Sequence, residues 1–271
     1  MPFKPINPRN AIVEASVYIH FNRPVAQNET DAIRALHQRK FATELPKLEN
    51  STAISARPGL PPFSAPMLTM ASFMRDGYFD TKIALSNQLL AISFRNYANW
   101  SDVSEKIKDW SDEILQAMIS GKTDENTPNL SVLSIGHQIV DVFVWDGNKE
   151  EASLQDLFRK PMSRLPQEIW EARGDYWLAI HSRNTRLQEQ GNLIDFLALD
   201  LSEENALGLR LKLDHNLEHR FATPVIANDC FKFVDMNSFG GRIMDDLHEK
   251  NLALLREFLR DDVRKQIGMS S

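Results

Sequence analysis

The stretch Ile12-Val13-Glu14-Ala15-Ser16-Val17-Tyr18-Ile19-His20-Phe21 alternates between apolar and polar side chains. One side of the alternation carries Val13, Ala15, Val17, Ile19 and Phe21, and the other side carries Glu14, Ser16, Tyr18 and His20. A period of two predicts a half-buried β-strand. A polar second side is typical of an antiparallel sheet that packs on one face only.

Working outward from this strand, the first half predicts one helix, a loop, a meander and a long helix. The first helix begins at Asn28 or Thr30 and ends near Glu44. Five prolines between residues 45 and 67 predict a loop with one short strand at Ser51–Ala56. Three extended segments follow, with a hairpin turn at Asp76-Gly77. These segments and the closing helix are Met67–Arg75, Tyr78–Leu85, Leu89–Arg95 and Tyr97–Ser120.

The same order of elements starts again after a polar linker at residues 122–129. A long strand is followed by two short helical segments, the first capped by Ser153, then by a second meander and a final long helix. The predicted segments are Leu130–Trp145, Ser153–Phe158, Pro166–Glu171, Tyr176–Leu187, Leu193–Leu201, Ala206–Leu213 and Ser238–Ile267.

This repeated order predicts an α+β fold built from internally duplicated strand–helix–meander–helix units. Each meander exposes one apolar face, and one long amphipathic helix in each half can cover it. We expect residues 1–121 and 122–271 to form the two halves of one compact unit. The sheets lie side by side or form one continuous curved sheet packed on the long helices.

Length and composition are those of a globular protein. The chain has 271 residues, 42% hydrophobic and 25% charged, which excludes disordered and collagen-like chains. The single cysteine, Cys230, cannot form an intramolecular disulfide and is expected to be buried. No apolar run suits a membrane span or an export signal, so we expect a cytoplasmic protein without membrane contact.

The charges do not favour a nucleic acid as a direct ligand. The formal net charge is -6 and the isoelectric point is about 5.7. The first half holds 13 basic and 12 acidic residues, and the second half holds 18 and 25. Neither half has the basic excess that phosphate binding needs.

Several short motifs resemble those of a bacterial protein family of about this length that has a sporadic distribution and no assigned reaction. Ala11-Ile12-Val13-Glu14-Ala15 is similar to the opening strand of that family, and Tyr97-Ala98-Asn99-Trp100 to its Tyr-x-x-Trp at the first long helix. Leu197-Ala198-Leu199-Asp200-Leu201, and Leu247-His248 followed by Phe258, continue the resemblance. It covers nearly the whole chain.

The chain departs from this family in one strand. Where the family usually has Gly-Leu-Arg-Tyr-x-Asn, this chain has Gly136-His137-Gln138-Ile139-Val140-Asp141. A function that rests on the missing arginine is therefore in doubt. The sporadic distribution implies, by association, a mobile accessory gene such as a toxin–antitoxin or phage-defence component.

One motif has the spacing of a zinc site. His215-Asn216-Leu217-Glu218-His219 matches the His-x-x-Glu-His pattern of inverted zinc peptidases, which requires a helix. Here it follows a predicted strand and precedes Pro224, and the downstream glutamate ligand motif is missing. We interpret it as a solvated turn and expect no metal, no cofactor and no catalytic residue.

Other chemistry-bearing residues have structural interpretations. His20, His137 and His181 lie in predicted strands as hydrogen-bonded side chains. Glu14 is an outward-facing residue, a buried residue with an arginine partner, or a ligand or partner contact across the strand. Gly240-Gly241 lacks the Lys-Ser/Thr of a phosphate loop. The acid pairs Asp245-Asp246 and Asp261-Asp262 are expected on a solvated helix face rather than at a metal site. The arginines Arg256, Arg260 and Arg264 could form a basic stripe and are expected in ion pairs within the helix, and the tryptophans Trp100 and Trp110 are expected in the core.

Two functions remain open from the sequence. The first is a non-catalytic binding or regulatory protein that acts through a protein partner, with a homodimer as a further option. The second is a small-molecule binder or hydrolase that uses a cavity between the sheet and a helix; a pocket with Glu14, a histidine and an arginine would favour it. Whether the chain is an enzyme is left open, and the first hypothesis is preferred.

Overall fold

The structure of the chain is a computed structural model. It describes residues 3–7, 11–55, 63–95, 99–122, 128–159, 166–171, 173, 176–204, 208–231, 239–267 and 269. The elements of the first half are β1 (Phe3–Pro5), β2 (Ile12–Phe21), α1 (Gln27–Leu36), the π-helix η1 (His37–Phe41), β3 (Lys47–Ser55), β4 (Phe63–Phe73), β5 (Phe79–Ser86), β6 (Leu89–Phe94) and α2 (Trp100–Ser120).

In the described ranges, the second half contains four strands, four α-helices and three short 3-10 turns. Its elements are β7 (Ser131–Trp145), η2 (Lys149–Glu151), η3 (Leu154–Asp156), α3 (Gln167–Glu171), β8 (Trp177–Arg186), η4 (Gln188–Gln190), β9 (Gly191–Glu204), β10 (Gly208–Ile226), α4 (Ala227–Cys230), α5 (Phe239–Phe258) and α6 (Asp261–Gln266).

The strands of the described chain form one continuous antiparallel sheet. Its order is β3-β4-β5-β6-β2-β7-β10-β9-β8, and β1 pairs with the end of β7 beyond β2. The pairing of β2 with β7 joins the two halves. From this centre outward, each half runs through the last, middle and first strand of its meander, and β3 is an extra strand in the first half. The fold is therefore α+β and internally duplicated, as the sequence predicts.

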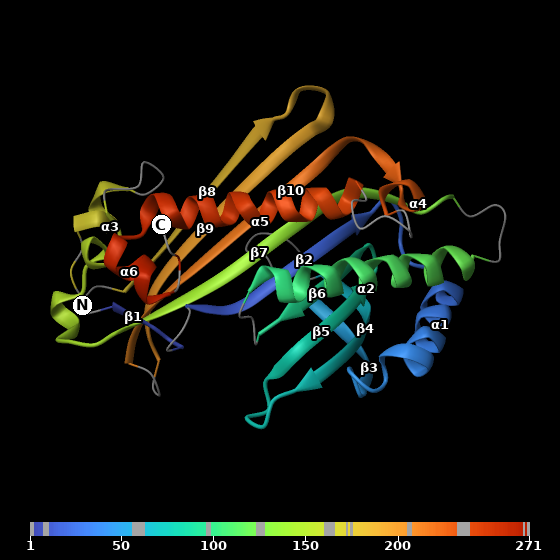
Figure 1. Ribbon diagram of the computed structural model, residues 1–271, viewed down its shortest axis with the longest axis horizontal. Coiled ribbons are helices and arrows are strands. Elements are labelled where there is room, and N and C mark those ends of the chain that lie inside the picture. The colour runs from blue at the N-terminus through green and yellow to red at the C-terminus, as the bar shows by residue number, and fades with distance from the viewer. Residues whose placement is uncertain are drawn as a thin grey trace.

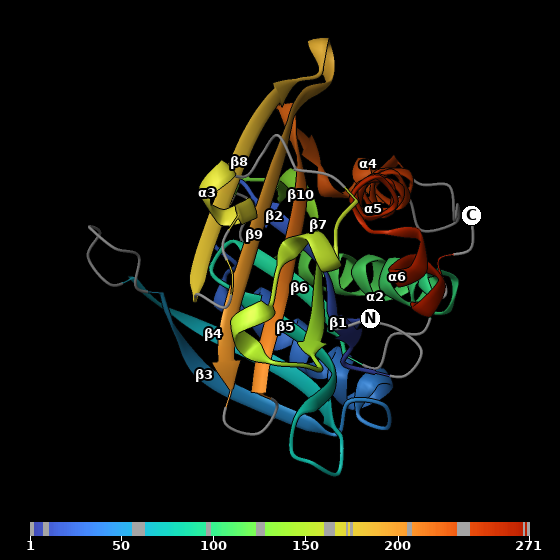
Figure 2. The same ribbon diagram turned by 90° about the vertical axis from the view of Figure 1, so that its left-hand side faces the viewer.

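The long helices lie on one side of this sheet. Figure 1 shows α2 and α5 running in front of the strands, and Figure 2 shows the sheet on one side and α1, α2 and α5 on the other. Two hydrophobic cores lie beneath the helices. The first contains Trp110 of α2 together with Leu247 of α5, so it is shared by the two halves, and the second contains Leu255 of α5. We call the sheet face under the helices the helix face and the opposite one the open face.

The strand register assigns residues to the two faces. One row of paired residues places His137 opposite Val17 and Leu217 on the helix face, where α5 contacts His137 through Asn251. The neighbouring row places Gln138 opposite Ser16 and Asn216 on the open face. The polar side of β2 predicted from the sequence therefore forms part of the open face.

The predicted loop between residues 45 and 67 is wrong in part. β3 spans Lys47–Ser55 and is longer than the predicted short strand Ser51–Ala56. β4 begins at Phe63, four residues before the predicted start at Met67. Pro66 is tolerated in β4 because β5 pairs with β4 only from Met67 onward, so at Pro66 only β3 is a neighbour and β4 is an edge strand.

The C-terminal helix is interrupted, whereas the sequence predicted one helix to Ile267. α5 ends at Phe258, and α6 starts at Asp261. The backbone N–H of Arg260 donates to the Leu157 carbonyl, and Arg260 has an extended conformation (φ -61°, ψ 151°). The hydrogen bond to the η3 region replaces a bond within the helix and breaks it.

Two further predictions concern the burial of Cys230 and the absence of a membrane-spanning helix. Cys230 is fully buried, as predicted, and burial raises the pKa of its thiol to about 12. None of the helices in the described ranges has the length and apolar character needed to cross a bilayer.

Candidate binding surface

The open face carries a group of polar side chains where the two halves meet. They come from the three central strands β2, β7 and β10, and several are half-buried although no side chain of the long helices lies on this face. We call this group the open-face cluster; it consists of Glu14, Ser16, Tyr18, His20, Gln138, Asp214, Asn216, Glu218 and Arg220.

Tyr18 spans all three strands of the cluster. Its ring lies over Gly136 of β7, where an added Cβ atom would come within 1.9 Å of the tyrosine Cζ. Beyond Gly136, the Tyr18 hydroxyl donates a hydrogen bond of 2.7 Å to Oδ1 of Asn216. Burial, and then the charge of Glu218, raise the pKa of Tyr18 above its ordinary value. Gly136 is therefore required for the position of the ring.

Glu218 and Arg220 form the charged end of the cluster. The Nε and Nη2 atoms of Arg220 donate to the two oxygens of Glu218 at 2.9 and 3.2 Å. Burial would raise the pKa of Glu218, but hydrogen bonds from Arg220 and Ser134 outweigh burial, and the pKa lies below its ordinary value. Burial lowers the pKa of neighbouring His20, whose ring contacts Tyr18 edge-on at 5.4 Å.

The rest of the cluster is also held by hydrogen bonds. Gln138 Nε2 donates to Asp214 at 2.7 Å, and the Ser16 hydroxyl donates to Ser93 at 2.7 Å. Glu14 lies 4.0 Å from Arg95, so it faces outward with a cationic neighbour. Because these bonds connect neighbouring strands, the side chains are ordered before any ligand arrives.

This arrangement makes a testable prediction about Gly136. Alanine at this position should destabilise the protein by ~1–3 kcal/mol, because the new Cβ atom overlaps the Tyr18 ring. In a Tyr18→Ala background the same substitution should cost much less, because the ring is gone. Melting temperatures of the four proteins of this double-mutant cycle test the contact. Equal costs of Gly136→Ala in both backgrounds would show that Tyr18 lies elsewhere.

The His-x-x-Glu-His motif lies in β10 and not in a solvated turn, so that interpretation was wrong. In a strand, His215 and His219 point to the helix face and Glu218 to the open face, so Glu218 cannot act as the base beside a zinc ion held by the two histidines, as the motif requires. His215 Nε2 lies 3.2 Å from Asp195 Oδ1, and His219 Nε2 lies 3.2 Å from the Gln190 carbonyl. No group of three metal-binding side chains occurs in the described part of the chain.

A second polar group lies on the helix face between the two cores. Trp100 at the start of α2 stacks on His248 of α5, with ring centroids 4.4 Å apart, and meets His137 of β7 edge-on. Asn251 Nδ2 contacts His137 Nδ1 at 2.6 Å. Burial lowers the pKa of His137 far below its ordinary value and that of His248 to about 4. These neutral rings connect the halves as a structural junction.

This junction brings together residues that carry the family resemblance. Trp100 belongs to the Tyr-x-x-Trp motif and His248 to the Leu-His motif, and they lie 148 positions apart but in direct contact. Asp245, which we expected on a solvated face, accepts hydrogen bonds from Trp100 Nε1 at 3.0 Å and Lys108 Nζ at 2.7 Å. The motifs thus record a packing contact between α2 and α5.

Several other charged residues of the C-terminal helices form ion pairs, including the expected arginines Arg260 and Arg264. Lys250 pairs with Asp246 one turn away, Arg264 with Asp261, and Arg260 with Asp262. His181 in β8 is half-buried. Gly240, at the start of α5, packs against the Phe231 ring.

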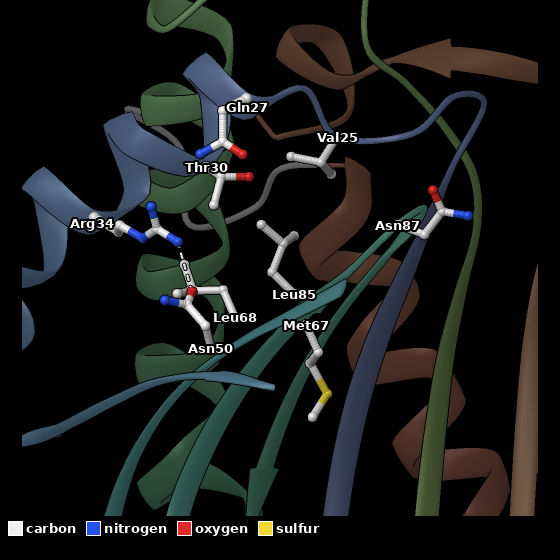
Figure 3. A pocket seen from close by; sticks show the side chains of 9 residues that line it. All are labelled: Val25, Gln27, Thr30, Arg34, Asn50, Met67, Leu68, Leu85 and Asn87. Atoms are coloured by element: carbon white, nitrogen blue, oxygen red, sulfur yellow. Dashed lines mark hydrogen bonds between the residues drawn. The ribbon is translucent and has the colours of Figure 1, made fainter. Parts of the chain in front are cut away.

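A small cavity lies between α1 and the sheet, near β3 (Figure 3). Its volume is about 150 Å³. Leu68 and Leu85 reach into it from the sheet, and Arg34 lies at its rim, where the guanidinium donates to Asn50 at 2.6 Å and to Asp31 at 2.9 Å. The cavity contains the expected arginine, but neither Glu14 nor a histidine lines it.

The edge strand β8 exposes apolar side chains that the sequence analysis did not single out. Leu178 and Ile180 are 61% and 60% exposed and point to the open face. The sequence carries a sign of this exposure, because the strand has apolar residues on both of its sides. Leu178 and Ile180 lie on one side, and Trp177 and Ala179 lie on the other.

Comparisons with known proteins add no functional assignment. No family model and no curated protein matches the chain. The solved structure of the di-domain ARO/CYC BexL from the BE-7585A biosynthetic pathway aligns with 90% of this chain and 96% of that chain. Its sequence identity is 10% and its TM-score is 0.19, which is too low to carry an argument about fold or function. Function must therefore be argued from the residues of the chain itself.

Proposed function

We propose that the chain is a non-catalytic binding protein that acts through a protein partner, and that the partner contacts the open-face cluster. The observation that carries the proposal is the hydrogen-bonded order of Tyr18, Asn216, Glu218 and Arg220 on a sheet face that the long helices leave free. Tyrosine and arginine are enriched at protein interfaces, and ordered side chains lose less entropy on binding.

The charges of the open face favour a protein over a nucleic acid. Arg220 pairs with Glu218, Arg210 with Glu204, and Lys212 lies 4.0 Å from Asp214. A phosphate backbone requires cations that carry a net positive charge into the interface. Alternating pairs instead suit a surface with charges of both signs, such as another protein.

The protonation behaviour of the cluster favours binding over proton transfer. A general base works best when its pKa lies near the working pH. The pKa of Glu218 is lowered, because Arg220 and Ser134 hold its charge, and the pKa of Tyr18 is raised by burial. Both groups are thereby held in one protonation state and serve as fixed acceptor and donor.

The biological setting is part of the same proposal. The resemblance to a sporadically distributed bacterial family supports an accessory system of toxin–antitoxin or phage-defence type. The partner would then be the product of a neighbouring gene.

An arginine substitution on each face tests this proposal. The tagged full chain is expressed in the organism that carries the gene, and its complexes are analysed by native mass spectrometry. Wild type should retain a defined partner in fixed stoichiometry, and Arg220→Glu should lose it because two like charges then face each other at Glu218. Arg39→Glu on η1 changes the same charge on the helix side and should retain the partner. Loss with Arg39→Glu but not with Arg220→Glu contradicts the proposal.

The cavity beneath α1 favours a second candidate, a small-molecule binder. An apolar floor with a few polar groups at the rim is the usual composition of ligand sites, and about 150 Å³ suits a ligand no larger than benzene. Thr30→Trp would fill the cavity from its rim. A small molecule that copurifies with wild type and is lost from Thr30→Trp at unchanged melting temperature would support this candidate.

A further inference from the structure

β8 is an edge strand with a free side. It pairs with β9 over ten residue pairs, and no other strand of the described chain pairs with its outer side. In an antiparallel edge, about half of the residues direct their N–H and C=O groups outward. β8 therefore presents a row of hydrogen-bonding groups that another strand can use.

The two edges of the sheet differ in their protection against such pairing. Charged side chains on an edge strand prevent unwanted association. At the opposite edge, β3 carries Lys47 and Glu49, which pair with each other, and Asn50 is bonded to Arg34. In contrast, Trp177–Ser182 of β8 contains no Asp, Glu, Lys or Arg, and Leu178 and Ile180 are its most exposed aliphatic side chains.

We propose that β8 pairs antiparallel with β8 of a second copy of this chain, with the two-fold axis at Ala179. This inference is independent of the proposed function, because it uses the sheet edge and not the open-face cluster. In this register, Leu178 of each copy lies opposite Ile180 of the other. Four exposed aliphatic side chains then form one apolar group on the open face, and the two Ala179 residues face each other without steric conflict.

Charge complementarity supports the same arrangement. Arg183 is exposed, and its guanidinium bonds only to the Thr185 hydroxyl among the described residues. Glu203 lies at the other end of the strand pair, in β9, where it accepts a hydrogen bond from Tyr176 and pairs with Lys149 at 3.5 Å. Antiparallel pairing about Ala179 brings Arg183 of each copy to the end at which Glu203 of the other copy lies. Glu203 lies one strand further from the axis on the same face, within reach of the long arginine side chain, and the two-fold axis repeats this arrangement.

The symmetry also explains why the association would stop at two copies. An isologous contact uses the same surface on both chains, so pairing of β8 with β8 leaves no free β8 edge. The remaining β3 edges carry the charged side chains described above. A closed dimer with one continuous sheet follows, and it places two open faces side by side.

The solution mass tests the dimer. The full chain should have about twice its monomer mass of 31.0 kDa by light scattering. Ile180→Asp should shift the dissociation constant at least tenfold towards the monomer and leave a folded monomer with wild-type circular dichroism, because the side chain is 60% exposed in the single chain. Tyr78→Asp is the matched control, since Tyr78 is 57% exposed in the β4–β5 hairpin, and it should remain dimeric. A wild-type monomer at all concentrations, or a dimer that survives Ile180→Asp, would overturn the proposal.

Cysteine cross-linking tests the register. The natural Cys230 is buried, so wild type should give no covalent dimer under mild oxidation. Ala179→Cys should form one, because directly opposed strand residues have the Cα separation of a disulfide. Leu178→Cys and Ile180→Cys should each fail alone and succeed when combined in one chain. A covalent dimer of Ile180→Cys alone would show another register and overturn the arrangement about Ala179.

Discussion

Replacing Trp110 with alanine is expected to lower the free energy of unfolding by about 3–5 kcal/mol, through the lost burial of the indole and the cavity that remains. The side chain is only 5% exposed, in agreement with the predicted apolar stripe of α2. Its ring stacks on Phe94 of β6 at 5.9 Å and contacts Phe41 of η1 at 5.7 Å. Trp110 therefore connects the long helix, the π-helix and the sheet of the first half.

Urea unfolding of purified variants measures this effect. Ile119→Ala in the same helix is the control, because Ile119 is 36% exposed and its truncation removes little burial. Trp110→Phe should cost less than Trp110→Ala, since an aromatic ring remains between Phe41 and Phe94. If Trp110→Ala kept the wild-type stability but lost a protein partner, the stripe would be an interface and the packing of α2 on the sheet would be wrong.

Replacing Asp141 with asparagine is expected to remove a large pH dependence of stability. Asp141 is 1% exposed in β7, and neither carboxyl oxygen has a hydrogen-bond partner in the described structure. Burial raises its pKa from 3.8 to about 7.

The sign of the effect follows from proton binding. Between pH 4 and pH 7 the unfolded chain has already lost the Asp141 proton while the folded chain retains it, so stability falls as the pH rises. A difference of about three pKa units corresponds to about 4 kcal/mol. We therefore compare the free energy of unfolding of Asp141→Asn with that of wild type at each pH. Between pH 4 and pH 8 this difference should shift in favour of the variant by about this amount.

Chemical unfolding of both proteins between pH 4 and pH 8 measures this difference. Comparing the two proteins cancels the contributions of other titrating groups, including Asp112, whose pKa burial raises to about 6. Asp102→Asn, at an exposed position of α2, controls for the loss of one negative charge. Parallel pH profiles for wild type and Asp141→Asn would mean that Asp141 is solvated or paired in the folded protein.

Periodicity predicts those elements whose polar and apolar residues are unambiguous. β2 has the predicted bounds Ile12–Phe21, and the predicted stripe of α2 is buried at Ile107, Trp110 and Ile114. The alternation of β10 was followed only to Leu213, because His215 and His219 were interpreted as polar turn residues. They occupy apolar positions of a longer strand, where neighbouring strands and α5 bury them.

The open-face cluster was only partly predictable for a different reason. Alternation within β2 identifies Glu14, Ser16, Tyr18 and His20 as one polar side. Their neighbours Gln138 and Asn216 come from strands more than 100 residues away, and the register that brings them together depends on long-range pairing. The exposure of Leu178 likewise depends on β8 being the last strand of the sheet, which no local pattern specifies.

Amine cross-linking of the partner complex, followed by mass spectrometry, tests the central claim most directly. Lys212 and Lys82 lie on the open face, whereas Lys40, Lys106 and Lys250 lie on the helical side. If the partner binds the open-face cluster, its cross-links should concentrate on Lys212 and Lys82. Cross-links confined to Lys40, Lys106 and Lys250, with Lys212 and Lys82 unmodified by the partner, would contradict the proposal.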